Sequence, residues 1–276
     1  MYKFLSFPLL LFVLLVINMY KLQNKTKTNT ASYWMMFFAI MMMAFPEKLL
    51  AAYKVEGADG PMVKMMMSGM SMQFFGGCIT TMIASRSSDK TISHVAGANV
   101  LSFLVSVGYT ITLGMKKSKA AGIPTDGMYF NVAMSLFFAF INYQAHQDTG
   151  AEKPHIVKKS NNMVTLIRAN MLCAIVFGLG CLFASDMMIA NYMPGAPENA
   201  LPFIKMMLPS MGLMMIQNAF RFGGLILSED EDTQHGAVRA VMIWWGFQMM
   251  SVCKDKQLNG LIGNEKAKKT MSQNDH

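Results

Sequence analysis

Two aspartate–histidine pairs have the residue types and the spacing that proton-transfer chemistry uses. His94 follows Asp89 by five residues, and His235 follows Asp230 by the same interval. A carboxylate close to an imidazole can orient the ring and raise its pKa, as a general base or a proton relay requires. We therefore take these four residues as candidate catalytic residues. The alternative is that each aspartate belongs to a polar turn and each histidine only flanks the start of a helix.

Four basic residues beside apolar runs are candidate ligand-binding residues: Lys64, Lys205, Arg221 and Arg239. Each lysine lies three residues after a proline that starts a helix, where its side chain can reach lipid headgroups or guard the mouth of a cavity. The two arginines flank the consecutive acidic residues at 229–232. We expect each arginine to neutralise this acidic run, since an arginine that faces lipid alone is costly.

Metal-binding patterns are weak in this sequence, and we assign no metal ligands and identify no cofactor. The four cysteines form no CxxC pair, and the acidic run lacks EF-hand spacing. Met66/Met70 and Met207/Met211 have the MxxxM spacing of Cu(I) channels, and thioethers suit this soft ion. Among 31 methionines such pairs also arise by chance, so Cu(I) transport is the weakest of the functions considered.

The composition predicts an all-α, multi-pass integral membrane bundle with about eight transmembrane helices. Hydrophobic residues make up 53% of the chain and charged residues 14%, whereas soluble chains carry about 25% charged residues. The apolar runs are long enough to cross a bilayer as helices. The net charge of +8 lies in short loops and the C-terminal tail. Such charges orient helices and meet anionic headgroups, so we expect membrane lipids and other membrane proteins as partners, and no nucleic acid.

The predicted organisation divides the chain into five parts. These are a signal-anchor or signal peptide with a basic linker (1–31), a first membrane unit of four helices (32–145), a polar linker (146–163), a second unit of three helices (164–253) and a basic polar tail (254–276). The helices after the leader are expected at 33–52, 62–85, 94–114, 127–144, 165–190, 202–227 and 236–252.

Residues 61–112 align with residues 202–253 without a gap, which predicts a parallel internal repeat. The two copies share a proline, a lysine, an aspartate and a histidine in one register, and these residue types are scarce in this chain. Four helices separate each position from its counterpart, so the two copies would cross the membrane in the same direction.

The stretches Phe-Phe-Gly-Gly-Cys-Ile (74–79) and Arg-Phe-Gly-Gly-Leu-Ile (221–226) each run into a polar turn and another helix. In this respect the chain resembles DoxX-like small four-helix membrane proteins. The resemblance implies a four-helix unit and does not imply an activity, because much of that group is biochemically obscure.

Several polar residues fall within the apolar runs, where such groups face the bundle interior and bond between helices, or line a substrate path. They are Asn99, Asn131, Asn142, Arg168, Gln217, Asn218 and Gln248.

Lysines and arginines are somewhat more numerous in the loops on the N-terminal face, which predicts that both termini lie in the cytosol. We expect the protein to be an integral protein of the secretory pathway or another endomembrane, because its first segment has the layout of a signal anchor or signal peptide. The primary functional hypothesis is a non-enzymatic scaffold or binder of an apolar or lipid-like ligand, because no complete catalytic constellation is recognisable. The alternative is a membrane enzyme or transporter for a lipid-like substrate, with His94 and His235 in proton transfer. Whether the protein is an enzyme stays open at this point.

Overall fold

The computed structural model describes residues 23–46, 48, 51, 61–122, 125–157, 161–193, 198, 201–243 and 246, and all regular structure in these ranges is helical. The all-α prediction is therefore confirmed for this part of the chain. The predicted leader helix before residue 23 and the tail 254–276 lie outside the described residues.

The helices follow one another along the chain with mostly short connections. They are α2 (Asn24–Ala44), α4 (Pro61–Ala84), α5 (Asp89–Tyr109), the π-helical turn η1 (Thr110–Gly114), α6 (Met115–Ala120), α7 (Asp126–Asp148), α8 (Asn162–Phe183), α9 (Ser185–Tyr192) and α10 (Leu201–Ser228). A further helical segment covers 231–243.

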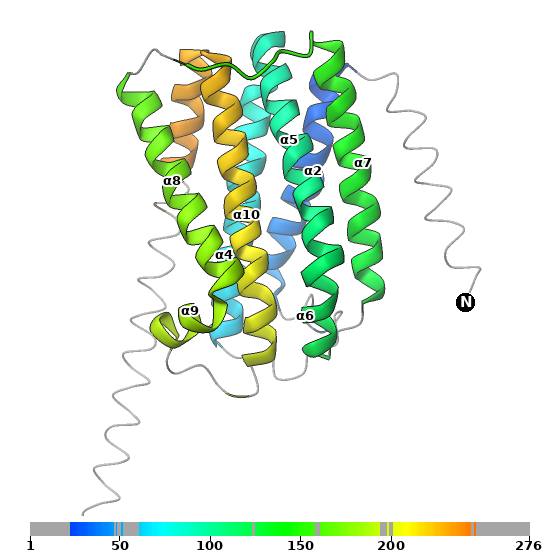
Figure 1. Ribbon diagram of the computed structural model, residues 1–276. Coiled ribbons are helices and arrows are strands. Elements are labelled where there is room, and N and C mark those ends of the chain that lie inside the picture. The colour runs from blue at the N-terminus through cyan, green and yellow to red at the C-terminus, as the bar shows by residue number, and fades with distance from the viewer. Residues whose placement is uncertain are drawn as a thin grey trace, which may run out of the picture.

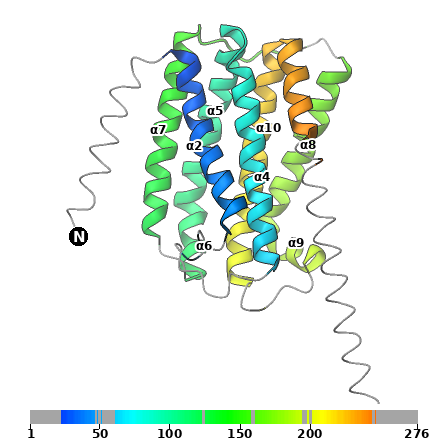
Figure 2. The same ribbon diagram turned by 180° about the vertical axis from the view of Figure 1, so that it is seen from behind.

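The long helices lie side by side in one bundle, with α10 packed against α4, α5 and α8 (Figures 1 and 2). On one side α2 packs against α4 and α7, and α5 packs against α7. The extended residues 151–157 cross one end of the bundle, and α9 lies at the other end (Figure 1). We call the first of these the polar end; it contains residues 23–27, 85–94, 146–157 and 228–235.

The helices predicted at 62–85, 127–144 and 202–227 agree with the structure to within four residues. The helix predicted at 94–114 lies in a longer helical stretch that covers 89–120, and the helix predicted at 236–252 begins at residue 231. The helix predicted at 33–52 begins at Asn24, because Lys27 is buried in an ion pair of 2.7 Å with Asp148 of α7. The Thr28 and Thr30 hydroxyls also donate to the carbonyl oxygens four residues earlier, which satisfies these polar groups within the helix. The helix predicted at 165–190 is broken at Ala184 into α8 and α9.

The outward faces of the bundle are apolar, while much of its interior is polar. Large exposed side chains on α7 and α8 include Tyr129, Phe130, Phe140, Leu172, Val176, Phe177 and Phe183. Buried side chains include Thr80, Thr81, Ser93, Asn99, Asn142 and Arg221. Within the described ranges, two helical stretches, Asp89–Ala120 and Asn162–Phe183, are long and apolar enough to cross a membrane. In the second stretch, only 17% of an apolar 18-residue part is buried within the bundle. Most of the apolar surface of this helix therefore faces outward.

The α8–α10 contact depends on two facing glycines. A Cβ atom at Gly178 would lie 2.8 Å from the carbonyl oxygen of Gly212, closer than real Cβ contacts come. The two backbones can approach this closely only because neither residue has a side chain, as in other small-residue contacts between helices.

Gly178→Ala should therefore destabilise the protein by about 1–3 kcal/mol, the usual cost of overpacking a close contact. Gly108→Ala in α5 is the matched control, because a Cβ there meets nothing within 4 Å. This control should be neutral or stabilising, since alanine favours helix over glycine. Thermal unfolding of both purified variants measures the difference, and equal melting temperatures would show that the α8–α10 contact is not close.

Candidate functional site

An apolar cavity of about 270 Å³ lies within the bundle. Its wall comes from α2, α4, α5, η1, α7 and α10 and consists mainly of methionine and aromatic side chains: Trp34, Met35, Phe38, Met42, Met67, Met70, Phe74, Phe103, Met128, Met134, Phe138, Phe203, Met206, Met207 and Met214. The π-helical turn adds Thr110 and Gly114 to this wall. Such turns occur frequently at functional sites, because they displace side chains from the regular helical positions.

The buried guanidinium of Arg221 lies next to this cavity. Arg221 is 2% exposed; its Nε donates to Asn99 Oδ1 at 2.9 Å and its Nη1 donates to Asn218 Oδ1 at 2.8 Å. Its Nη2 lies 3.9 Å from Met35 Sδ, and Met35 is part of the cavity wall. No carboxylate of a described residue contacts the guanidinium, so neutral acceptors hold this cation.

The amides around Arg221 form a network that joins α4, α5, α7 and α10. Asn99 Nδ2 donates to Asn142 Oδ1 at 3.1 Å, and Gln217 Nε2 donates to the Ser102 carbonyl at 2.8 Å. Asn218 Nδ2 donates to the Gln73 side chain at 3.1 Å. The prediction that polar residues in the apolar runs bond between helices is confirmed for Asn99, Asn142, Gln217 and Asn218. Asn131 lines the cavity, Arg168 donates to the Val157 carbonyl near the bundle surface, and Gln248 lies outside the described residues.

Gly77 of α4 makes room for this network. A Cβ atom at Gly77 would lie 2.6 Å from Asn218 Oδ1 and 2.7 Å from Arg221 Nη1. The second glycine of the Phe-Phe-Gly-Gly-Cys-Ile stretch is therefore required by the approach of α10.

The expectation that Arg221 neutralises the acidic run at 229–232 is wrong for the contacts described, because the side chain is held by the amides inside the bundle.

The candidate catalytic residues all lie at the polar end, but His94 has partners other than Asp89. His94 is 4% exposed, and its ring centroid lies 5.7 Å from that of His155. The Nε2 atom of His94 has no hydrogen-bond partner among the described residues. His155 Nε2 lies 3.6 Å from Glu229 Oε2, and the Lys90 Nζ lies 3.3 Å from the same oxygen. The hydrogen bond from Lys90 holds the pKa of Glu229 below its usual value.

The remaining members of the two aspartate–histidine pairs do not face their expected partners in the described contacts. Asp89 is exposed and lines a polar pocket, and His235 is exposed on the segment 231–243. Asp230 accepts from the Thr91 hydroxyl at 3.1 Å and from the Thr233 N–H at 3.0 Å. Asp230 thus caps the helical segment that follows it and ties that segment to the start of α5.

The candidate basic residues are scattered over the bundle. Lys205 at the opposite end forms a 2.8 Å ion pair with Asp186 of α9, and this hydrogen bond lowers the pKa of Asp186. Arg239 is exposed on the segment 231–243. Lys64 is in α4, but its side chain lies outside what the structure describes. Of the three candidates whose side chains the structure describes, Arg221 is the one placed beside the cavity.

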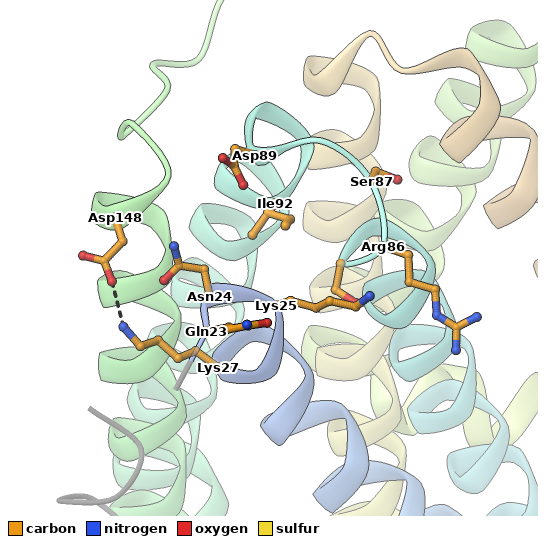
Figure 3. A pocket seen from close by; sticks show the side chains of 10 residues that line it. Gln23, Asn24, Lys25, Lys27, Arg86, Ser87, Asp89, Ile92 and Asp148 are labelled. Carbon is orange, nitrogen blue, oxygen red and sulfur yellow. Dashed lines mark hydrogen bonds and ion pairs between the residues drawn. The ribbon is translucent and has the colours of Figure 1, made fainter. Parts of the chain in front are cut away.

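A polar pocket of about 490 Å³ opens at the polar end, between the start of α2, the α4–α5 turn and the end of α7 (Figure 3). Lys27 reaches across to Asp148, whereas the guanidinium of Arg86 points away from this pair (Figure 3). With Lys25 and Asp89, the pocket wall carries three basic and two acidic side chains. Its chemistry is that of a mixed-charge surface at the end of a helical bundle.

Two histidines that contact the start of α5 were not predicted from the sequence. His146 and His155 fall in or beside the linker 146–163, yet His146 Nδ1 lies 3.0 Å from Ser93 Oγ and His155 packs on His94. No local pattern signals contacts between residues so far apart in the chain. Of the methionines considered for Cu(I), Met66, Met70 and Met207 belong to one buried apolar cluster with Val63 and Ile204.

Asp230 makes stability at the polar end depend on pH. Burial opposes its charge, but hydrogen bonds from Thr233 and Thr91 outweigh burial and lower the pKa of the carboxyl below its usual value of about 3.9. A carboxyl whose pKa is lower in the folded state stabilises the protein above the unfolded-state pKa, and this stabilisation is lost as pH falls through the folded-state value.

Asp230→Asn should therefore lower the melting temperature at pH 6–7, and the difference from the wild type should shrink as pH falls below about 4. Melting curves from pH 7 to pH 3 measure this difference. Asp232→Asn, at a neighbouring exposed carboxyl, is the control and should follow the wild type. A gap between wild type and Asp230→Asn that stays constant over the whole range would contradict the assignment.

Comparison of the chain with family models, with curated protein sequences and with solved structures gives no match. The resemblance to DoxX-like proteins therefore has only the two Phe-Gly-Gly stretches in its support. The function must be inferred from the cavity, the buried arginine and the surface of the bundle.

Proposed function

We propose that this protein is a multi-pass integral membrane bundle that binds a small apolar or lipid-like molecule without transforming it. The observation that carries the proposal is the cavity of about 270 Å³ with a methionine and aromatic wall. Ligand pockets have volumes of about 300–1,000 Å³ and are mostly apolar with a few polar groups. Methionine suits such a wall because its flexible thioether adapts to irregular apolar shapes.

The distribution of polar and apolar residues supports the membrane assignment. Apolar side chains cover the outward faces of α7 and α8, and the amide network lies in the interior. A soluble core helix would bury its apolar surface, but α8 leaves most of it exposed. In a bilayer this arrangement is favourable, because the interior satisfies the polar groups and the acyl chains meet the apolar faces.

The packing of the helices supports the proposed parallel repeat. In the first copy α2 packs against α4, and α5 follows after a short turn; in the second copy α8 packs against α10, and the segment 231–243 follows after a short turn. Pro61 starts α4, and Pro202 is the second residue of α10. The two copies meet where α4 packs against α10, beside the cavity.

The size of the cavity limits the ligand. A volume of about 270 Å³ is near the lower end of the range for ligand pockets, so it fits one hydrocarbon chain or one small ring system and not a whole two-chain phospholipid. We accordingly propose that phospholipids surround the bundle as membrane partners. The membrane would belong to the secretory pathway or another endomembrane, and both termini of the chain would lie in the cytosol.

Ser106→Phe should abolish ligand binding, because Ser106 lines the cavity and a phenylalanine there would fill it. Val105→Phe is the matched control, since Val105 is exposed on the outer face of α5. The measurement is mass spectrometry of apolar molecules extracted from each purified variant and from the wild type. A compound present at near-stoichiometric amounts in the wild type and the control, and lost in Ser106→Phe, is the expected result. The absence of any such compound from all three would contradict the proposal.

A membrane enzyme or transporter for a lipid-like substrate is the second candidate, and His94 favours it. His94 is buried with an unpaired Nε2 atom and packs on His155, which in turn lies 3.6 Å from Glu229; together these groups have the parts of a proton relay. His235 is exposed and has no comparable surroundings among the described residues.

His94→Gln separates the two candidates, because glutamine keeps a polar side chain of similar reach but does not titrate near neutral pH. Proton flux into liposomes that hold the reconstituted protein and a pH-sensitive dye is the measurement, with His235→Gln as the control. The binder proposal expects equal flux for wild type and both variants. Flux that the wild type shows and His94→Gln loses would establish the transporter instead.

A further inference from the structure

We propose that the cavity takes a single-chain hydrocarbon with a terminal carboxylate, and that Arg221 is the group that binds the carboxylate. This inference rests on the proposed function, because it names the chemical class of ligand for the same cavity.

The first step is the unmet charge of Arg221. A guanidinium has five N–H donors and keeps its charge in proteins. In the described contacts it donates to two neutral amide oxygens and approaches one thioether. A buried cation is expensive unless an anion compensates it, and polar groups within a membrane bundle usually mark a ligand or ion path. The ligand itself can supply the missing negative charge.

The second step is the position of the guanidinium relative to the cavity. Met35 Sδ lies 3.9 Å from Arg221 Nη2, and the same side chain is part of the cavity wall. Gln217, which also lines the wall, precedes Arg221 by one helical turn on α10. A movement of the flexible Met35 side chain would thus open the guanidinium to the cavity. A thioether is a weak acceptor, so a carboxylate that replaces it forms a much stronger, charge-assisted hydrogen bond.

The third step is the charge of the rest of the wall. No charged side chain is among the described residues that line the cavity, and Arg221 lies behind the Met35 side chain of its wall. An anionic end therefore meets one cation and no repelling carboxylate, while a cationic end would meet only Arg221 and be repelled. The remaining apolar wall of methionine and phenylalanine fits the hydrocarbon chain. The combination selects an amphipathic anion over its neutral and cationic analogues.

The experiment titrates the full chain in nanodiscs at pH 8 with decanoate, 1-decanol and decylamine, which share one chain length and differ in charge. Trp34 lines the cavity and reports binding by its fluorescence. Trp244→Phe and Trp245→Phe remove the other two tryptophans of the sequence, so that the signal comes from Trp34 alone. Ser106→Phe, which fills the cavity, controls for partition of the probes into the bilayer.

Decanoate should bind at least about tenfold more tightly than decanol, with decylamine weakest, since a hydrogen bond to a charged group is worth at least one factor of ten. Arg221→Gln should remove the preference for decanoate while decanol still binds. Met35→Glu places a carboxylate of the protein beside Arg221 and should weaken decanoate alone, with Met35→Leu as its matched control. In Met35→Glu the new carboxylate pairs with Arg221 in place of the ligand, so this variant tests the inference even if Arg221→Gln does not fold.

Equal affinities of the wild type for decanoate and decanol would overturn the role of Arg221 and leave the apolar binder proposal intact. Loss of decanol and decanoate binding alike in Met35→Glu, with Met35→Leu unaffected, would also count against a specific carboxylate contact. No saturable change of Trp34 fluorescence with any probe would overturn the proposed function together with this inference.

Discussion

The burial of the Arg221 guanidinium without a carboxylate among the described contacts is the constraint on which the rest of the interior depends. A cation in an apolar bundle needs acceptors from every side, and three of the helices around α10 contribute to its surroundings. Asn99 of α5 and Asn218 of α10 supply oxygens, Met35 of α2 supplies a thioether, and Gly77 of α4 supplies the space. The positions of α2, α4, α5 and α10 are thus coupled through one side chain.

The same constraint connects the interior of the bundle to its surface. Because the polar residues are used inside, the outward faces of α7 and α8 are left to apolar side chains that a bilayer can solvate. Ionisable groups gather instead at the ends of the bundle, where Lys27 pairs with Asp148 and Lys90 contacts Glu229. The cavity lies between these ends and next to Arg221, a buried cation that no carboxylate of a described residue contacts.

The sequence was sufficient for the helical architecture because long apolar runs and the prolines at helix starts are local signals. Helix α4 was predicted at 62–85 and found at Pro61–Ala84, and α10 at 202–227 and found at Leu201–Ser228. The start of α2 was missed because the distant partner of Lys27 keeps that stretch helical.

The site was harder to predict for the same reason, because its contacts join residues that are far apart in the chain. Arg221 was identified as a ligand-binding residue but assigned to the neighbouring acids, since local charge gave no sign of the amides of α5. His155 was missed because its contact with His94 is visible only in the folded chain.

Native mass spectrometry of the intact protein, purified from the cells that make it, tests most directly whether the cavity holds a ligand. We expect a stoichiometric adduct with the mass of one single-chain apolar acid, released at high collision energy and identified as an anion after release. A bare chain at every collision energy, or an adduct that is equally abundant when the cavity is filled by a larger side chain, would contradict it.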